Sequence, residues 1–156
     1  FASPLRRAVH TAELIGLAGP RVDARLMELD WGEWVGRTRA ELRARDPLGF
    51  ARNEARGWDF RPPGGESARE LAARLSQWLA EVVARGRPVV AVTHKGVIQT
   101  ALALATGSDP AERPPFRLDW RCAQHFVAAG DGAGLRVERV NVALEARRAS
   151  GRAAGS

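Results

Sequence analysis

The chain has 156 residues, of which 45% are hydrophobic and 27% are charged, a composition typical of a globular domain with one core. It contains no run of 18 apolar residues and no charged-then-apolar leader pattern, so we expect no membrane partner and a cytoplasmic location. A single cysteine, Cys122, cannot form an internal disulfide and lies in no metal-ligand spacing, so we expect no metal or other cofactor.

The net charge of +6 and the pI near 11.2 would suit a polyanionic partner. The arginines are, however, dispersed among acidic residues and are not interleaved with aromatic residues. We therefore do not expect nucleic acid as a partner. Phosphate or a small phosphorylated metabolite remains compatible with the charge, and the sequence leaves the oligomeric state open.

The N-terminal third of the chain predicts one helix followed by an ordered loop. Ser3 and Pro4 suit the start of a helix, and apolar residues then recur at helical spacing, which predicts a helix over residues 4–17. Residues 22–36 have no clear period although they contain two tryptophans. We expect an ordered loop there.

Two capping boxes predict the next helices. Thr38 is followed by Glu41, and Ser67 is followed by Glu70, so each pair can satisfy the free N–H groups at a helix start. The first of these helices should be short. The second should be the longest in the chain, because its apolar residues keep a period of 3.6 almost to Gly86. Between them, residues 47–63 should form an irregular flap that carries a short helix.

The C-terminal half predicts strands. Residues 88–93 form a short apolar run typical of a strand buried on both faces of a parallel sheet, and residues 96–105 should form the helix that follows it. Residues 125–129 and 135–140 should form two strands joined by the Gly130-Asp131-Gly132 turn.

The order of these elements predicts an α/β fold, a three-layer sandwich with a mostly parallel central sheet and helices on both faces. We expect one domain over residues 1–144 and a disordered tail over residues 145–156, which is rich in Arg, Ala, Gly and Ser.

Two predicted strand ends carry residues that suit a phosphate group. Ser3 precedes a helix whose first turn contains Arg6 and Arg7, and His94 and Lys95 stand between the 88–93 strand and the next helix. Ligands of such sheets gather at the carboxyl ends of the strands, where helix N-termini offer free N–H groups to anions. Arginine can donate two parallel hydrogen bonds to phosphate.

Four segments in order then carry a family resemblance. Their patterns are S-P-L-x-R-A-x-x-T-A, L-x-E-x-x-x-G-x-W-x-G, P-G-G-E-S and a strand ending in Thr-His, and they fall at residues 3–12, 26–36, 63–67 and 90–98. Together they resemble the histidine phosphatase superfamily, whose fold is phosphoglycerate mutase-like.

The resemblance implies roles for individual residues. Arg7 would hold the transferring phosphoryl group, His94 would donate to its oxygens, and Glu28 would act as general acid and then as general base. Ser3, Lys95 and Trp31 would also contact the substrate.

Other interpretations of these positions remain open. Asp30 or Glu33 could replace Glu28 as the acid, and Glu28 could simply pair with Arg25. Trp31 could belong to the core, Lys95 could act only through its charge, and Glu66 with Ser67 could be no more than a helix start.

The nucleophile of the family is the histidine of an Arg-His-Gly motif that precedes the Ser-Pro-Leu segment. None of His10, His94 and His125 has Arg before it and Gly after it, and the first residue is Phe1 rather than Met. We therefore expect a fragment that lacks the first strand region and is inactive by itself. The intact protein should be a phosphomonoester hydrolase that works through phosphohistidine. A phosphoglycerate-type mutase and a non-catalytic phosphate-binding remnant are the alternatives.

Overall fold

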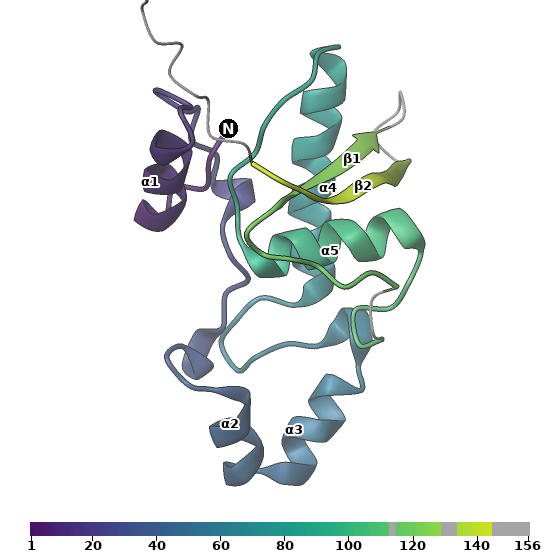
Figure 1. The fold of residues 1–156 in the computed structure, drawn as a ribbon. Helices are drawn as coiled ribbons and strands as arrows, with labels where there is room; N and C mark the ends of the chain where they lie inside the picture. Colours follow the sequence, from purple (N-terminus) through teal and green to yellow (C-terminus); the bar gives the residue numbers. More distant parts are fainter. Residues whose placement is uncertain (113–114, 129–133, 145–156) are drawn as a thin grey trace, which may run out of the picture.

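The computed structural model describes residues 1–112, 115–128 and 134–144 and has an α/β fold (Figure 1). The predicted turn at 130–132 and the predicted tail at 145–156 lie outside these residues. The described part contains five α-helices and two strands: α1 (Arg6–Leu14), α2 (Arg39–Arg45), α3 (Pro47–Glu54), α4 (Ala68–Ala84), α5 (Lys95–Thr106), β1 (Ala123–Ala128) and β2 (Leu135–Val142).

The capping boxes are both confirmed, at the starts of α2 and α4. Helix α1 is shorter than predicted at both ends. It has Leu5 at its N-cap, and the Ser3 hydroxyl accepts the N–H of Leu5 and also lies 2.7 Å from Nε2 of His94. It stops before Gly16, whose φ of 83° is left-handed and cannot continue a right-handed helix.

The predicted parallel sheet is represented by three short extended segments. Ala2 forms parallel bridges to Val22 on one side and to Val92 on the other. The structure has no strand over residues 88–93, and Val90 is 54% exposed rather than buried on both faces. The backbone hydrogen bonds of this segment all go to residues 1–3, which cover one of its edges. A mostly parallel central sheet therefore remains a prediction.

The two predicted C-terminal strands are confirmed as the antiparallel pair β1 and β2. The register shifts on either side of His125, so the ladder is irregular there. Strand β2 packs against α5. The two strands lie at the opposite end of the molecule from α2 and α3 (Figure 1).

The apolar face of α4 builds the core, as its period predicted. Leu71, Leu75 and Trp78 of α4 are buried together with Leu26 and with Val97 of α5. Full burial of an aliphatic side chain of this size contributes roughly 1.5–3 kcal/mol. This core fixes α5 against α4 and so places the start of α5, where His94 and Lys95 lie.

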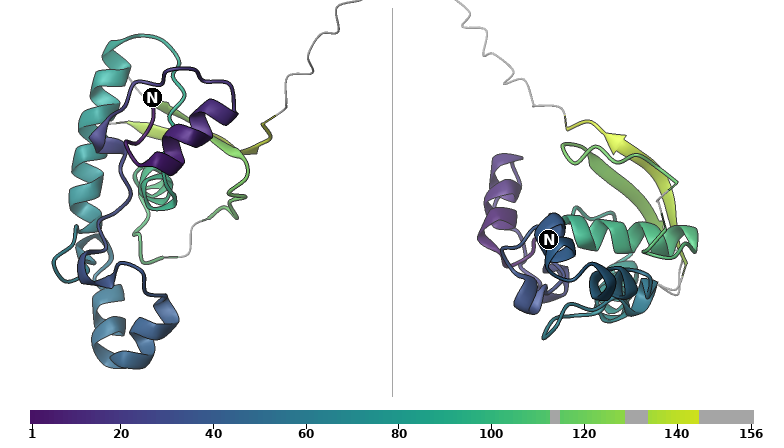
Figure 2. Two further views of the ribbon diagram at one scale, coloured as in Figure 1. Left: turned by 90° about the vertical axis from the view of Figure 1, so that its left-hand side faces the viewer. Right: turned by 90° about the horizontal axis from the view of Figure 1, so that it is seen from below.

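The predicted flap contains α3 and a following turn, and with α2 it forms a small lobe that projects from the rest of the molecule (Figure 2). Asp46 caps α3, whose first residue is Pro47. Leu42 and Phe50 are buried where α2 meets α3. Of the helices described in residues 1–112, none is long and apolar enough to cross a membrane.

Candidate functional site

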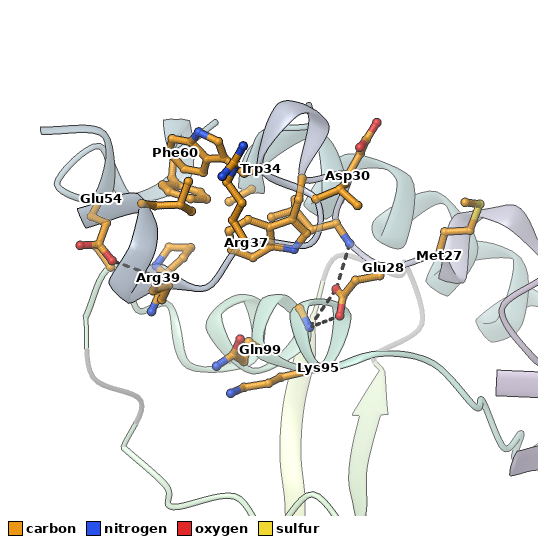
Figure 3. Close-up of a pocket in the computed structure, with 18 of the residues that line it drawn as sticks. Met27, Glu28, Asp30, Trp34, Arg37, Arg39, Glu54, Phe60, Lys95 and Gln99 are labelled. Atoms are coloured by element: carbon orange, nitrogen blue, oxygen red, sulfur yellow. Dashed lines mark hydrogen bonds and ion pairs between the residues drawn. The ribbon is translucent and has the colours of Figure 1, made fainter. Parts of the chain in front are cut away.

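A cleft of about 1300 Å³ lies between the α2–α3 lobe and the starts of α1 and α5. Arg7, Glu28, Trp31 and Lys95 all line it, so the structure brings together residues from three of the four sequence motifs. Glu28 and Lys95 are labelled among the lining residues in Figure 3. Ser3 and His94 are buried next to it and are not among the lining residues.

Ser3, Arg7 and His94 are joined by hydrogen bonds. The Nε2 atom of His94 lies 2.7 Å from the Ser3 hydroxyl, and the Nε of Arg7 donates to Nδ1 of His94 over 3.2 Å. Because a guanidinium can only donate, Nδ1 is the unprotonated nitrogen, and the Nε2–H then donates to Ser3. These bonds hold the tautomer of His94 and turn its one N–H towards Ser3.

The surroundings of His94 favour its neutral form. The side chain is buried, with 7% of its surface exposed. Burial lowers the pKa of His94, and the positive charge of Arg7 lowers it further, while Glu28 acts in the opposite direction. His94 can therefore act here as a neutral hydrogen-bond donor.

The Glu28 carboxylate lies at the N-terminus of α5. Its Oε1 accepts the N–H of Leu29 at 2.9 Å and the N–H of Gly96 at 3.1 Å (Figure 3). A Cβ at Gly96 would lie 2.3 Å from the same oxygen, so only glycine leaves room for the carboxylate. The alternative that Glu28 pairs with Arg25 is wrong, because Arg25 binds Asp23 and Glu81.

The two rival carboxylates lie in different surroundings. Asp30 lines the cleft, but it is exposed and accepts the N–H of Gly32 in a local turn. Glu33 is exposed and is not among the lining residues. Glu28 is the one of the three that contacts α5.

The other predicted substrate contacts stand on the cleft walls. The ammonium of Lys95 lies 5.0 Å from the centre of the Trp120 ring, a cation–π distance. Trp31 packs edge-on against Phe60, with ring centres 5.9 Å apart, and Trp34 lines the cleft beside them. The tryptophans thus contribute to the cleft and to local packing at once.

Several other polar residues of the helices and strands lie away from this arrangement. Arg6 and His10 are exposed on α1, and His125 is exposed on β1. Ser67 caps α4, as expected.

Arg74 and Glu66 contact the loop that carries Glu28, and sequence reasoning missed this pair. Arg74 binds Glu66 through Nε at 2.6 Å and also donates to backbone carbonyls of the loop. The available signal was an arginine in the apolar stripe of α4, between Leu71 and Trp78. Among the described residues, no group of three or more His, Cys, Asp or Glu is placed to hold a metal ion.

Comparison with known proteins gives consistent matches. The family model described as histidine phosphatase superfamily (branch 1) matches residues 1–143, which include every helix and strand described above. A glucosyl-3-phosphoglycerate phosphatase of Mycobacterium tuberculosis is 41% identical over 155 residues, which cover 86% of this chain and 68% of the relative. A 2,3-bisphosphoglycerate-dependent phosphoglycerate mutase of Methylobacterium radiotolerans is 33% identical over 130 residues, which cover 76% of this chain and 60% of that relative.

A solved structure matches the fold as well. The mycobacterial glucosyl-3-phosphoglycerate phosphatase in complex with inorganic phosphate superimposes with a TM-score of 0.73 at 30% identity, covering 92% of this chain and 76% of that one.

Proposed function

The chain belongs to the histidine phosphatase superfamily, and from this premise we propose that it carries the phosphate-binding and proton-transfer residues of a phosphomonoester hydrolase. The Arg7 guanidinium and the Glu28 carboxylate line the same cleft, and Arg7 is also hydrogen-bonded to His94. This arrangement is the main support for the proposal. A substrate phosphate and its leaving oxygen need these two kinds of group close together.

Ser3, Arg7 and His94 form what we call the phosphate end of the site. Arg7 has one N–H engaged by His94 and is exposed to the cleft, so its remaining donors can bind phosphoryl oxygens. The Nε2–H of His94 donates to the Ser3 hydroxyl, which a phosphoryl oxygen would replace as acceptor. Both donors would then stabilise the charge of the transition state.

Glu28, its loop over residues 25–33, and Gly96 form the proton-transfer end. As the P–O bond of the substrate breaks and a P–N bond forms, Glu28 gives its proton to the leaving alcohol. Water then attacks the phosphorus, Glu28 takes a proton from that water, and the P–N bond breaks to release phosphate.

The acceptor in this scheme is a histidine. His10 and His125 are exposed on α1 and β1, and His94 has both ring nitrogens engaged by Arg7 and Ser3. We therefore propose that the acceptor is a histidine outside the printed sequence and that the 156 residues alone give no turnover.

The substrate is proposed to be a small phosphorylated metabolite. The two relatives compared above act, by their names, on glucosyl-3-phosphoglycerate and on phosphoglycerates. The aromatic residues Trp31, Trp34 and Phe60 on the cleft wall would face the part of the substrate beyond its phosphate.

The test is to express the complete coding sequence that contains these residues and to measure phosphate release from phosphomonoesters. Glu28→Gln should lower kcat by about 10²- to 10⁴-fold, since it removes the proton donor but keeps the size of the side chain. With 4-nitrophenyl phosphate, whose leaving group needs no proton, acid-labile phosphate on a histidine should accumulate in that variant, because the attack of water still lacks its base. Asp30→Asn and Glu33→Gln are the matched controls.

Three outcomes would contradict the proposal in different ways. Unchanged turnover in Glu28→Gln would assign the acid elsewhere. Transfer of the phosphoryl group to a second metabolite in place of release would make the protein a mutase. Phosphate binding without any turnover of the complete protein would make it a binding remnant.

A further inference from the structure

The loop that carries Glu28 is held from one side by a single arginine of α4. Arg74 donates to the carbonyl of Arg25 at 2.6 Å and to that of Met27 at 2.8 Å, and its Nη2 lies 3.5 Å from the carbonyl of Glu28 itself. One guanidinium therefore contacts the main chain at and immediately before the proposed acid.

Glu66 holds Arg74 in that position. The two side chains form a bidentate pair, with Nε to Oε1 at 2.6 Å and Nη2 to Oε2 at 2.9 Å. The side chains of Arg74 and Glu66 are only 19% and 18% exposed, so water competes little for these bonds. A planar guanidinium can serve a carboxylate and the two nearer carbonyls at once, which the compact ammonium of a lysine cannot do.

The turn at residues 63–66 holds the other side of the loop through its backbone. Glu66 donates its N–H to the carbonyl of Asp30, and Glu33 donates its N–H to the carbonyl of Pro63, each over 2.9 Å. A Cβ at Gly65 would lie 2.4 Å from the Asp30 oxygen, and one at Gly32 would lie 2.2 Å from the Pro63 oxygen. Glycines at these two positions let the backbones touch.

We propose that Arg74, held by Glu66, is a positioning residue that sets where the Glu28 carboxylate lies against the start of α5. This inference rests on the proposed role of Glu28 as the proton donor. It also gives the P-G-G-E-S segment a physical role. Gly65 and Glu66 fix the loop on two sides, while Ser67 caps α4.

The first experiment needs no turnover and uses the 156-residue chain. The N–H of Gly96 donates to the Glu28 carboxylate, so its hydrogen exchange reports whether the carboxylate is in place. In Arg74→Lys, exchange at Gly96 should rise about tenfold, while Leu102 inside α5 keeps its protection. Arg69→Lys is the matched control, because Arg69 lies on the same helix and pairs with exposed Asp59.

An unchanged exchange rate at Gly96 in a folded Arg74→Lys protein would overturn the inference. Should that variant not fold, Glu66→Gln replaces it, since it keeps the side-chain shape and weakens only the pair with Arg74. The prediction for Gly96 is then the same.

The second experiment measures the complete protein with two kinds of substrate. For an alkyl phosphate, whose leaving oxygen needs a proton, Arg74→Lys should slow the first turnover by about 10²-fold with little change in KM. For 4-nitrophenyl phosphate, whose leaving group departs without a proton, the initial burst of nitrophenolate should slow by less than about threefold. First turnovers are compared because the later attack of water uses Glu28 with either substrate. Equal losses in the two first turnovers would mean a general structural role and would overturn the inference.

Glu28→Gln separates the two levels of the proposal. If it impairs turnover and Arg74→Lys does not, the positioning role fails alone. If Glu28→Gln has no effect, the proposed function fails, whatever Arg74 does.

Discussion

The two ends of the proposed site are held in different ways. At the phosphate end, side chains from two distant parts of the sequence bond directly to one another, Ser3 to His94 and His94 to Arg7. At the proton-transfer end, the Glu28 carboxylate receives backbone N–H groups, and its loop is held through the main chain. Substitutions should therefore act on the chemistry directly at the first end and through the position of a loop at the second.

After Glu28→Gln, the largest expected effect is at the phosphate end. Arg7→Ala removes both the cleft-facing donors and the partner of His94 Nδ1, so kcat/KM of the complete protein should fall by about 10²- to 10³-fold. Calorimetric titration of the 156-residue chain with inorganic phosphate should show a matching loss of affinity. Arg6→Ala, the exposed neighbour on α1, is the control and should change either value less than twofold.

Phosphate affinity that survives in Arg7→Ala would place the phosphate elsewhere in the cleft. Lys95 would be the next residue to change, since it lines the cleft at the start of α5.

A smaller effect is expected from Gly96→Ala, which tests the proton-transfer end. The new Cβ meets the mobile tip of Glu28, so the carboxylate moves while the backbone stays in place. Alanine is also the better helix former by up to about 1 kcal/mol. We therefore expect kcat on an alkyl phosphate to fall about tenfold and the melting temperature to stay the same or rise.

Gly65→Ala should behave in the opposite way. Its Cβ meets the Asp30 carbonyl, which belongs to the backbone and cannot turn aside. Thermal melts of the two alanine variants should therefore differ, with the loss of stability confined to Gly65→Ala. Equal melting temperatures would contradict the claim that the loop is held through its main chain.

The sequence predicted more of the arrangement around His94 than of the arrangement around Glu28. Predicted strand-to-helix boundaries point to Arg6, Arg7 and His94, because such boundaries meet at one edge of an α/β fold, and the family resemblance selects Arg7. Local patterns also predicted the capping boxes of α2 and α4. Local patterns predicted the 88–93 strand too readily, because whether an apolar run becomes a strand depends on the partners on both of its edges.

Arg74 shows what a local pattern does not contain. It donates to backbone carbonyls of residues 46 to 49 positions earlier in the chain. Because every residue has a backbone carbonyl, the residue types in a sequence do not indicate which carbonyl will accept. Gly32 and Gly65 could not be predicted for the same reason, since glycine is required there by a backbone contact between segments more than 30 residues apart.

The smallest expected effect is a pH dependence of stability at the phosphate end. The ordinary pKa of histidine is about 6.5, and burial together with Arg7 and Arg74 lowers the pKa of His94 in the folded protein, against the opposing effect of Glu28. Below pH 6.5 the unfolded chain therefore takes up a proton that folded His94 still resists. Stability present above that pH should be lost progressively as the pH falls towards the lowered folded-state pKa.

His94→Gln isolates this contribution. Its amide can still accept from Arg7 and donate to Ser3, but it does not titrate. Urea unfolding of the 156-residue chain at a series of pH values should show that wild type loses more stability than His94→Gln as the pH falls from 7 through 6.5. His10→Gln, at an exposed site on α1, should follow wild type. Parallel curves for wild type and His94→Gln would mean that His94 ionises freely in the folded chain, and its proposed action as a neutral donor to the phosphoryl group would then fail.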